Sequence, residues 1–164
     1  MKSCRRQLSR PRAGQQAFTM TELLFVVVII GILASLAAPS FSELIKSQRM
    51  KSMASDLNAS LTLARSEAIK RNKNVMLSPA TTAEHWEKGW QIAEEDTPDS
   101  YIEVHSAFAG LSPTAGPASV IYRSSGRIQG TTAPAFNISA DGVSAQRCVS
   151  VDLSGRPYVK ATSC

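Results

Sequence analysis

The sequence is poor in the residues from which catalytic and metal sites are usually built. Its 164 residues include only two histidines, His85 and His105, and three cysteines, Cys4, Cys148 and Cys164. Neither histidine stands at ligand spacing from a cysteine. There is no nucleophile elbow, and the glycines do not follow a phosphate-binding spacing. We therefore predict no enzymatic activity, no metal site and no cofactor.

Acidic residues are missing from the start of the chain. Five of the 18 basic residues precede Phe18 and no acidic residue does, within a sequence of net charge +5 and pI of about 9.4. Without this arm the remainder has 13 basic and 13 acidic residues and is neutral. The basicity that would suggest a nucleic-acid-binding protein therefore mostly describes a positive N-terminal arm, which is typical of exported proteins.

Few cysteines are present, but one pair lies outside that arm. Cys148 and Cys164 are separated by a span that a single disulfide would close, which favours an oxidising compartment. Closing a loop of about 15 residues would stabilise the fold by about 3 kcal/mol and hold the C-terminus in place. Two unrelated buried thiols are the alternative.

One long apolar run is present over residues 23–38, with Glu22 directly before it. Its length is at the lower limit for crossing a bilayer core of about 30 Å. A cleaved secretory signal, a plain signal anchor and a twin-arginine signal at Arg5 and Arg6 all fit this run. None of them explains Glu22, because a carboxylate at the head of a membrane segment is costly unless it is paired.

The residues after Pro39 show helical periodicity. One line of apolar side chains, called the apolar stripe below, recurs at intervals of three and four. Its members are Met50, Met53, Ala54, Leu57, Leu61, Ala64 and Ala68. We predict one helix of about 50 residues from Met20 to near Lys73, bent at Pro39 because proline removes a backbone hydrogen bond.

The rest of the sequence is typical of short β-strands separated by turns such as Ser125-Gly126, Asp141-Gly142 and Ser154-Gly155. The expected strands span residues 75–77, 89–93, 101–105, 120–123, 135–138, 148–153 and 157–160. The acidic residues 94–99 lack the ligand spacing of a calcium loop and are expected to form a solvated turn. We predict an α+β fold, with the N-terminal helix packed on a C-terminal antiparallel β head.

The segment Phe18-Thr-Met-Thr-Glu-Leu-Leu resembles the class III signal of type IV prepilins. The basic leader, Phe18, Glu22, Gly31 and Pro39 all fall at matching positions. Residues 64–72, 86–90, 125–127 and 154–156 are similar to motifs of the GspH/FimT family of minor pilins and pseudopilins. The resemblance implies the type IV pilin fold, with a leader (1–17), a transmembrane or filament stem (18–41), an amphipathic half-helix (42–73) and a β head (74–164).

The same resemblance implies a filament subunit processed at its N-terminus. A prepilin peptidase would cut between Ala17 and Phe18, and the new amine of Phe18 would be methylated. Glu22 would then pair with such an amine and register the subunit in the filament. The family usually has glycine before the cut, so Ala17 predicts slower cleavage. Other pilins or pseudopilins and an inner-membrane assembly platform are the implied partners, with the head in the periplasm.

Two functional classes are open within this family. The first is structural, either a minor pilin that helps initiate or cap a type IV pilus or a pseudopilin of a type II secretion system, and the second is DNA capture. Competence-associated members resemble one another in a Gly-Arg-x-Arg-x-Arg run near the C-terminus, and at its three arginine positions this chain has Arg156, Tyr158 and Lys160. These residues share one strand face and would bind double-stranded DNA weakly, without sequence preference. Useful affinity would need Arg123, Arg127 and Arg147 to converge on them.

Overall fold

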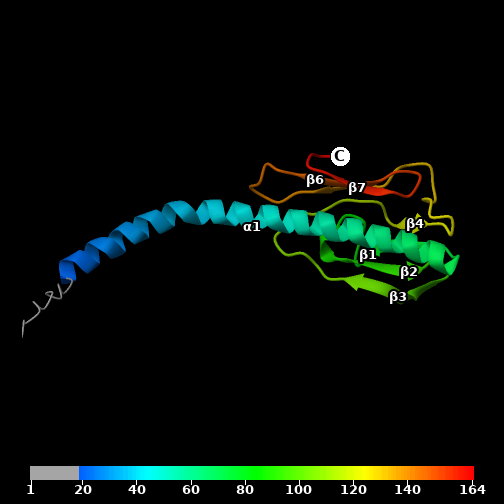
Figure 1. Cartoon of the computed structure of the whole chain (residues 1–164), viewed down its shortest axis with the longest axis horizontal. Coiled ribbons are helices and arrows are strands. Elements are labelled where there is room, and N and C mark those ends of the chain that lie inside the picture. Colours follow the sequence, from blue (N-terminus) through cyan, green and yellow to red (C-terminus); the bar gives the residue numbers. More distant parts are fainter. Residues whose placement is uncertain (1–18) are drawn as a thin grey trace, which may run out of the picture. The chain divides into compact units, whose positions relative to one another are not determined.

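The computed structural model describes residues 19–164, apart from the side chains of residues 36–40 and 98. The chain divides into two compact units, Met1–Pro39 and Ser40–Cys164. One helix, α1 (Met20–Arg71), contributes to both units (Figure 1). It ends at Arg71 rather than Lys73, since Asn72 takes a positive φ of 54°, a conformation that asparagine tolerates at helix ends.

The described part of the first unit is the start of α1. Its large apolar side chains between residues 23 and 33 are all exposed, with exposed fractions between 46% and 67%. In the described part of the chain, no helix contains a stretch that is both long enough and apolar enough to cross a membrane. Backbone helix continues through Pro39, whose side chain lies outside the described residues, so the predicted bend there stays a prediction.

The second unit contains two antiparallel sheets. The four-stranded sheet has the order β3-β2-β1-β4 and the three-stranded sheet the order β5-β6-β7. The strands are β1 (Val75–Pro79), β2 (Trp90–Glu94), β3 (Thr97–His105), β4 (Val120–Tyr122), β5 (Ala135–Ile138), β6 (Arg147–Val151) and β7 (Pro157–Lys160). All seven expected strands are present, and the predicted α+β class is confirmed.

Strand β3 is longer than the sequence predicted. It begins at Thr97, which pairs with Glu94, so that only residues 95 and 96 form the turn. The acidic character of this segment masked its strand pairing. Register shifts between Ile92 and Glu94 accommodate the extension. Because β3 is the edge of its sheet, Pro98 is tolerated there, as an edge proline forfeits no ladder hydrogen bond.

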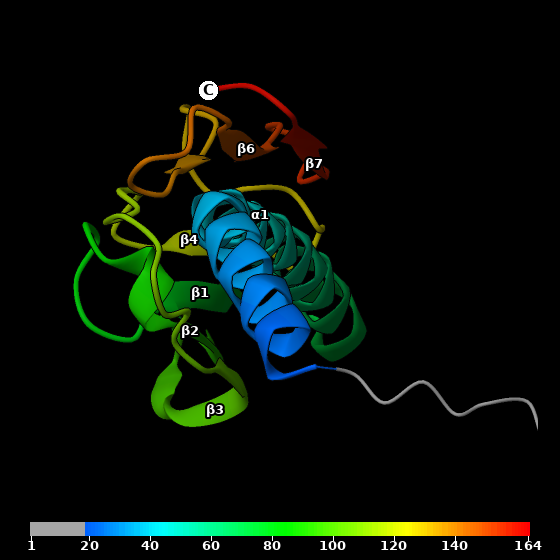
Figure 2. The ribbon, with the colours of Figure 1, turned by 90° about the vertical axis from the view of Figure 1, so that its left-hand side faces the viewer.

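The apolar stripe of α1 forms the centre of the core. Each of its seven residues is at most 1% exposed. They pack in one cluster with buried side chains of both sheets, including Leu77, Trp90, Phe136 and Val149. Figure 2 shows the helix end-on, with the two sheets meeting along it. Full burial of a large aliphatic or aromatic side chain contributes about 1.5–3 kcal/mol, so this stripe fixes α1 to the head.

A short 3-10 helix, η1 (Trp86–Lys88), anchors the long connection between β3 and β4. The buried carboxylate of Glu87 accepts a hydrogen bond from the backbone N–H of Thr114 at 2.8 Å. The indole N–H of Trp86 donates to the carbonyl of Pro117, and its ring packs edge-on against Phe136 at 4.8 Å. The connection is thereby held against the core by buried polar contacts rather than left as a free loop.

Candidate functional site

The N-terminal end of α1 is capped by a threonine. The backbone N–H of Glu22 donates to the hydroxyl of Thr19 at 3.2 Å, which satisfies one of the free N–H groups of the first turn. Glu22 is exposed in this first turn, where a negative charge suits the helix dipole. The predicted cleavage residues Ala17 and Phe18 lie outside the described residues, so the cut and the methylation stay predictions.

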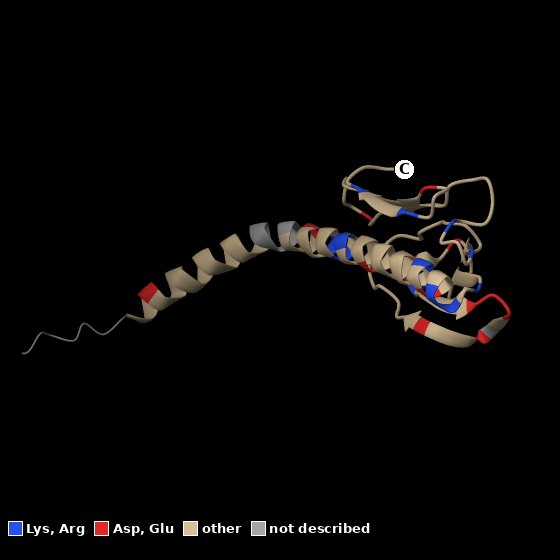
Figure 3. Ribbon diagram, turned by 45° about the vertical axis from the view of Figure 1, so that its right-hand side comes forward, with Lys and Arg blue, Asp and Glu red and all other residues tan. Residues whose placement is uncertain are grey.

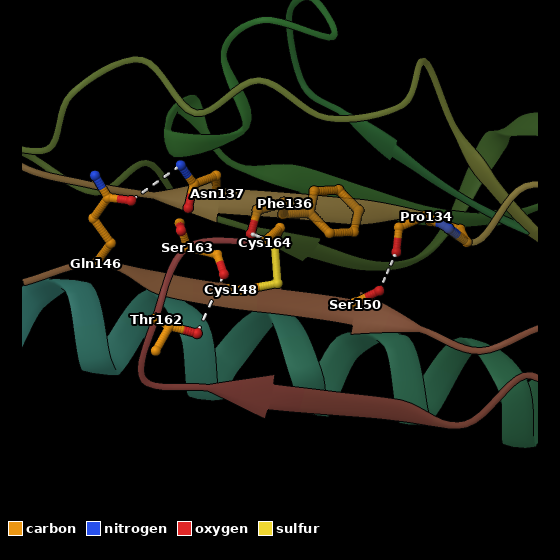
Figure 4. Close-up of a disulfide and its surroundings, with 9 residues drawn as sticks. All are labelled: Pro134, Phe136, Asn137, Gln146, Cys148, Ser150, Thr162, Ser163 and Cys164. Atoms are coloured by element: carbon orange, nitrogen blue, oxygen red, sulfur yellow. Dashed lines mark hydrogen bonds between the residues drawn. A yellow bond between two sulfur atoms is a disulfide. The ribbon is translucent and has the colours of Figure 1, made fainter.

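Cys148 and Cys164 form the predicted disulfide, with a Cα–Cα distance of 5.0 Å. Cys148 is on β6 and is 1% exposed. Figure 4 shows the segment after β7 folding back over the sheet, so that Cys164 meets Cys148. The disulfide closes the open end of the β6–β7 hairpin and holds the segment that follows Lys160 against β6. The alternative of two unrelated thiols is wrong.

Two arginine-bearing turns pack against each other. One turn holds Arg123 and Arg127, whose backbones pair at 2.9 Å. The other holds Arg156, whose carbonyl accepts from the N–H of Asp152 at 3.1 Å. At their contact, a β-carbon on Gly155 would overlap the carbonyl oxygen of Gly126. Only glycine permits this approach, and it brings three arginines from two separate turns to one end of the head.

Asp152 stabilises the second turn. Its carboxylate accepts from the Ser154 hydroxyl and, at 3.0 Å, from the backbone N–H of Arg156. The hydrogen bond from Ser154, followed by that from Arg156, lowers the pKa of Asp152. The guanidinium of Arg65, from α1, approaches the same turn through the Ser154 carbonyl at 3.4 Å. Sequence reasoning missed Arg65, which carries no signal beyond its place in a helical motif.

The structure brings together only some of the residues proposed for DNA. Tyr158 and Lys160 of β7 alternate with Arg156, directly before the strand, and share its outer face. The Lys160 ammonium lies 5.2 Å from the Tyr158 ring centroid. Arg147 lies on the other face of the hairpin, since it pairs with buried Ile138 and is two residues from buried Val149. It therefore does not join the group, in contrast to the convergence that useful DNA affinity was predicted to need.

Arg147 instead borders a groove of about 450 Å³ between α1 and the open end of the β6–β7 hairpin. Its wall on α1 follows one helical line at the border of the apolar stripe, which contributes Ala54. The lining residues are Lys51, Ala54, Ser55, Asn58, Arg147, Val159, Lys160 and Ala161. Lys51 and Asn58 were not predicted as site residues, although their spacing with Ser55 along the helix was readable in the sequence.

An ion-pair network joins the end of α1 to the β2–β3 hairpin. Glu67 contacts Arg71 at 2.6 Å, Arg71 reaches Glu94 at 3.0 Å, and Glu94 contacts Lys73 at 2.6 Å. Figure 3 shows the acidic turn next to the basic end of the helix. The hydrogen bond from Arg71 lowers the pKa of Glu67, and those from Lys73 and then Arg71 lower the pKa of Glu94.

Metal chemistry has no support among the residues that the structure describes. No group of three or more histidine, cysteine, aspartate or glutamate side chains there is placed to hold a metal ion. Two histidines there lie near a carboxylate, each with one such partner: His85 Nδ1 is 2.8 Å from Glu87, and His105 Nε2 is 3.7 Å from Asp56. The ring of His105 packs against those of Trp90 and Phe108, which also contact each other, and this is the environment of a packing residue.

Comparison with known proteins identifies the family of this chain. The sequence model described as "Type II transport protein GspH" matches residues 53–155, and the model described as "Prokaryotic N-terminal methylation motif" matches residues 12–38. No curated protein gives a significant match. Two crystal forms of the type IV minor pilin FimU from Pseudomonas aeruginosa share the fold.

The first FimU structure superposes with a TM-score of 0.62 at 22% identity, covering 70% of this chain and 90% of FimU. The second has a TM-score of 0.59 at 23% identity, covering 67% of this chain and 91% of FimU. The likeness confirms the predicted type IV pilin fold, a long N-terminal helix packed on antiparallel sheets. With the GspH model matching more than half of its length, the chain belongs to the GspH/FimT family of type IV minor pilins and pseudopilins.

Proposed function

We propose that this protein is a minor pilin, a membrane-anchored filament subunit that helps initiate or cap a type IV pilus. The observation that carries the proposal is the uncovered start of α1. Residues 23–33 are apolar on every side and exposed, whereas the stripe from Met50 to Ala68 is buried in the head. A helix that is apolar all round needs lipid or other helices to cover it. Membrane insertion before assembly and helix packing afterwards supply both.

The same proposal gives roles to the N-terminal residues. The methylation motif matched at residues 12–38 includes Ala17, Phe18 and Glu22. We place the peptidase cut between Ala17 and Phe18 at the inner membrane, with the head on the periplasmic side. Glu22 forms no ion pair within the described residues. Burial among apolar helices would therefore leave its charge uncompensated unless it met the Phe18 amine of its own or a neighbouring subunit.

The pilus is the preferred filament and the pseudopilin of a type II secretion system is the alternative. The two solved structures that share this fold are of a type IV minor pilin, whereas the matching family model is named for a type II transport protein. The proposed partners are other major and minor pilins, the prepilin peptidase and the inner-membrane assembly platform.

A complemented deletion strain tests the assembly role. The parent gene should restore surface pili and twitching, and Glu22→Gln should lower incorporation of the subunit at least about tenfold, because the buried amine loses its partner. Glu43→Gln is the matched control, since Glu43 is an exposed carboxylate on the same helix. Full rescue by Glu22→Gln would contradict the proposed pairing. Loss of protein secretion, with pili retained, would favour the pseudopilin.

Mass spectrometry of the mature protein tests the cut. The proposal expects a chain that begins at methylated Phe18 in cells with active peptidase. Ala17→Gly should accelerate its appearance in a pulse-chase, because glycine is the usual residue at that position in the family. A mature chain with any other first residue would overturn the assignment.

The two packed turns favour a second function, weak binding of double-stranded DNA. The turns of Arg123 and Arg127 and of Arg156 lie in contact, and Tyr158 and Lys160 continue from Arg156 along β7. We propose that these cations contact phosphates without reading the sequence. The proposed affinity is weak because Arg147 lies on the opposite face.

Gel-shift titration of the full chain in detergent micelles tests this function. Arg156→Ala with Lys160→Ala should weaken binding and lower the slope of log affinity against log salt by about 1.8, as two phosphate contacts are lost. Lys88→Ala is the control, because Lys88 is an exposed cation on η1, outside the two turns and β7. Unchanged binding in the double variant would refute the site.

A further inference from the structure

Strand β7 is an edge strand with unused backbone groups. Within the described residues it pairs only with β6. The backbone N–H of Asp152 donates to the carbonyl of Arg156. In antiparallel strands, hydrogen-bonded and non-hydrogen-bonded residue pairs alternate, so this bond fixes which pairs of β6 and β7 are hydrogen-bonded. Tyr158 and Lys160 therefore bond to β6, and the N–H and C=O of Val159 point away from it. Val151 supports this assignment, because its N–H points away from β7 and donates to the carbonyl of Pro134 at 3.0 Å.

The groove described above lies along this free edge. Val159 and Ala161 form its strand side, and Ala54, Ser55 and Asn58 lie on its helix side. Most of these side chains are small, so the groove has room for the alternating side chains of another strand. Val159 is 44% exposed, although it is an apolar residue in a strand. An exposed strand edge of this kind pairs readily with an added chain.

The charge of the groove is of one sign. Lys51, Arg147 and Lys160 line it, and no aspartate or glutamate does. Neither Lys51 nor Arg147 takes part in an ion pair among the described residues. The ammonium of Lys160 lies over Tyr158 on the outer face, so Lys51 and Arg147 are the cations available inside the groove. A negatively charged occupant complements them.

We propose that the β7 edge binds an extended, acidic segment of a partner protein. The segment adds as a fourth strand to the β5-β6-β7 sheet, hydrogen-bonding the N–H and C=O of Val159 and the C=O of Pro157. Its carboxylates reach Lys51 and Arg147. Main-chain pairing gives affinity in this mode of recognition, and the alternate side chains give specificity. The length of β7 suits a segment of about five or six residues.

Hydrogen-bonding groups favour a peptide over a nucleic acid in this groove. A phosphate accepts hydrogen bonds and donates none, whereas the β7 edge presents the outward carbonyls of Pro157 and of Val159, which lines the groove. The side-chain oxygen of Asn58 is also buried without a partner and needs a donor. A peptide backbone supplies donors and acceptors in alternation. This binding mode needs only the folded head and does not depend on the stem contacts proposed above.

Fluorescence anisotropy with a synthetic probe tests the proposal on the full chain in detergent micelles. The probe is a labelled, terminally blocked peptide of alternating valine and glutamate. Two control peptides keep its charge: one has alternate backbone nitrogens methylated, and the other has proline in place of valine. Both should bind at least about tenfold more weakly, because neither forms a full ladder. Equal binding of all three peptides would show simple charge attraction and overturn strand addition.

Protein variants separate the two parts of the site. Lys51→Glu with Arg147→Glu should weaken probe binding at least about tenfold, since two attractions become repulsions. Arg127→Glu is the control, as this exposed arginine lies outside the groove. Val159→Pro removes the outward donor and leaves the β6 ladder intact. Unchanged affinity in the Lys51→Glu, Arg147→Glu double variant and in Val159→Pro would refute the peptide site. Displacement of the probe by a DNA duplex of the same charge, to the same extent as by unlabelled peptide, would also refute it.

Discussion

The contact between the two arginine-bearing turns predicts a large difference between two glycine substitutions. Gly155 and Gly142 both have positive φ, 86° and 78°. An alanine at either position costs about 1–2 kcal/mol for the left-handed backbone. At Gly142 the new β-carbon would meet only the Lys46 side chain, at 3.9 Å. At Gly155 it would overlap the Gly126 carbonyl, so the turns must separate, at a further cost of about 1–3 kcal/mol.

Urea denaturation measures this difference. Trp86 and Trp90 are the two tryptophans of the chain and both are buried, so their fluorescence reports unfolding of the head. Gly142→Ala should lower the free energy of unfolding by about 1–2 kcal/mol, and Gly155→Ala by about 2–5 kcal/mol. Equal losses would show that the turns do not need their close approach. In that event the proposed grouping of the three arginines would also lose its basis.

Two further perturbations test the head. Replacing Cys148 and Cys164 with alanine should lower the free energy of unfolding by about 3 kcal/mol, and a reductant should produce the same loss in the parent and none in the variant. The lowered pKa values of Glu67 and Glu94 mean that their contacts stabilise the fold above the usual glutamate value of 4.5 and are lost as the pH falls below it. The urea midpoint should therefore drop as the pH is lowered. The drop should be less steep in the double variant Glu67→Gln with Glu94→Gln, because the network then has no carboxylate to protonate. An equally steep drop in this variant would contradict a role for the network.

The elements of the fold could be predicted from the sequence because their patterns are local. The stripe from Met50 to Ala68 repeats at helical spacing, and each of its residues is buried. The short strands are bounded by turn residues, and all of them formed. The start of β3 was missed because its acidic residues suggest solvent, although pairing with β2 decides its structure.

The arrangement of the site could be predicted only in part. Alternation correctly placed Arg156, Tyr158 and Lys160 on one face, because that relation lies within a single strand. The face of Arg147 was missed because the expected strand began one residue later, at Cys148. Since β6 starts at Arg147, alternation along the strand puts Arg147 on the same face as Val149. The meeting of Gly126 with Gly155 depends on how two sheets pack, and neither turn's sequence contains that information.

The direction of the apolar stripe determines how the head withstands force. From Met50 to Ala68 the buried residues follow the axis of α1 over about 27 Å. In the proposed filament, tension would pull this helix along its own axis, against the sheets. The stripe contacts are then loaded together in shear, because none can open before the whole helix slides. The disulfide and the Glu67, Arg71 and Glu94 network lie outside the stripe and secure other ends of the head. We expect a subunit built in this way to keep its head under a load that would peel apart a helix attached at one end only.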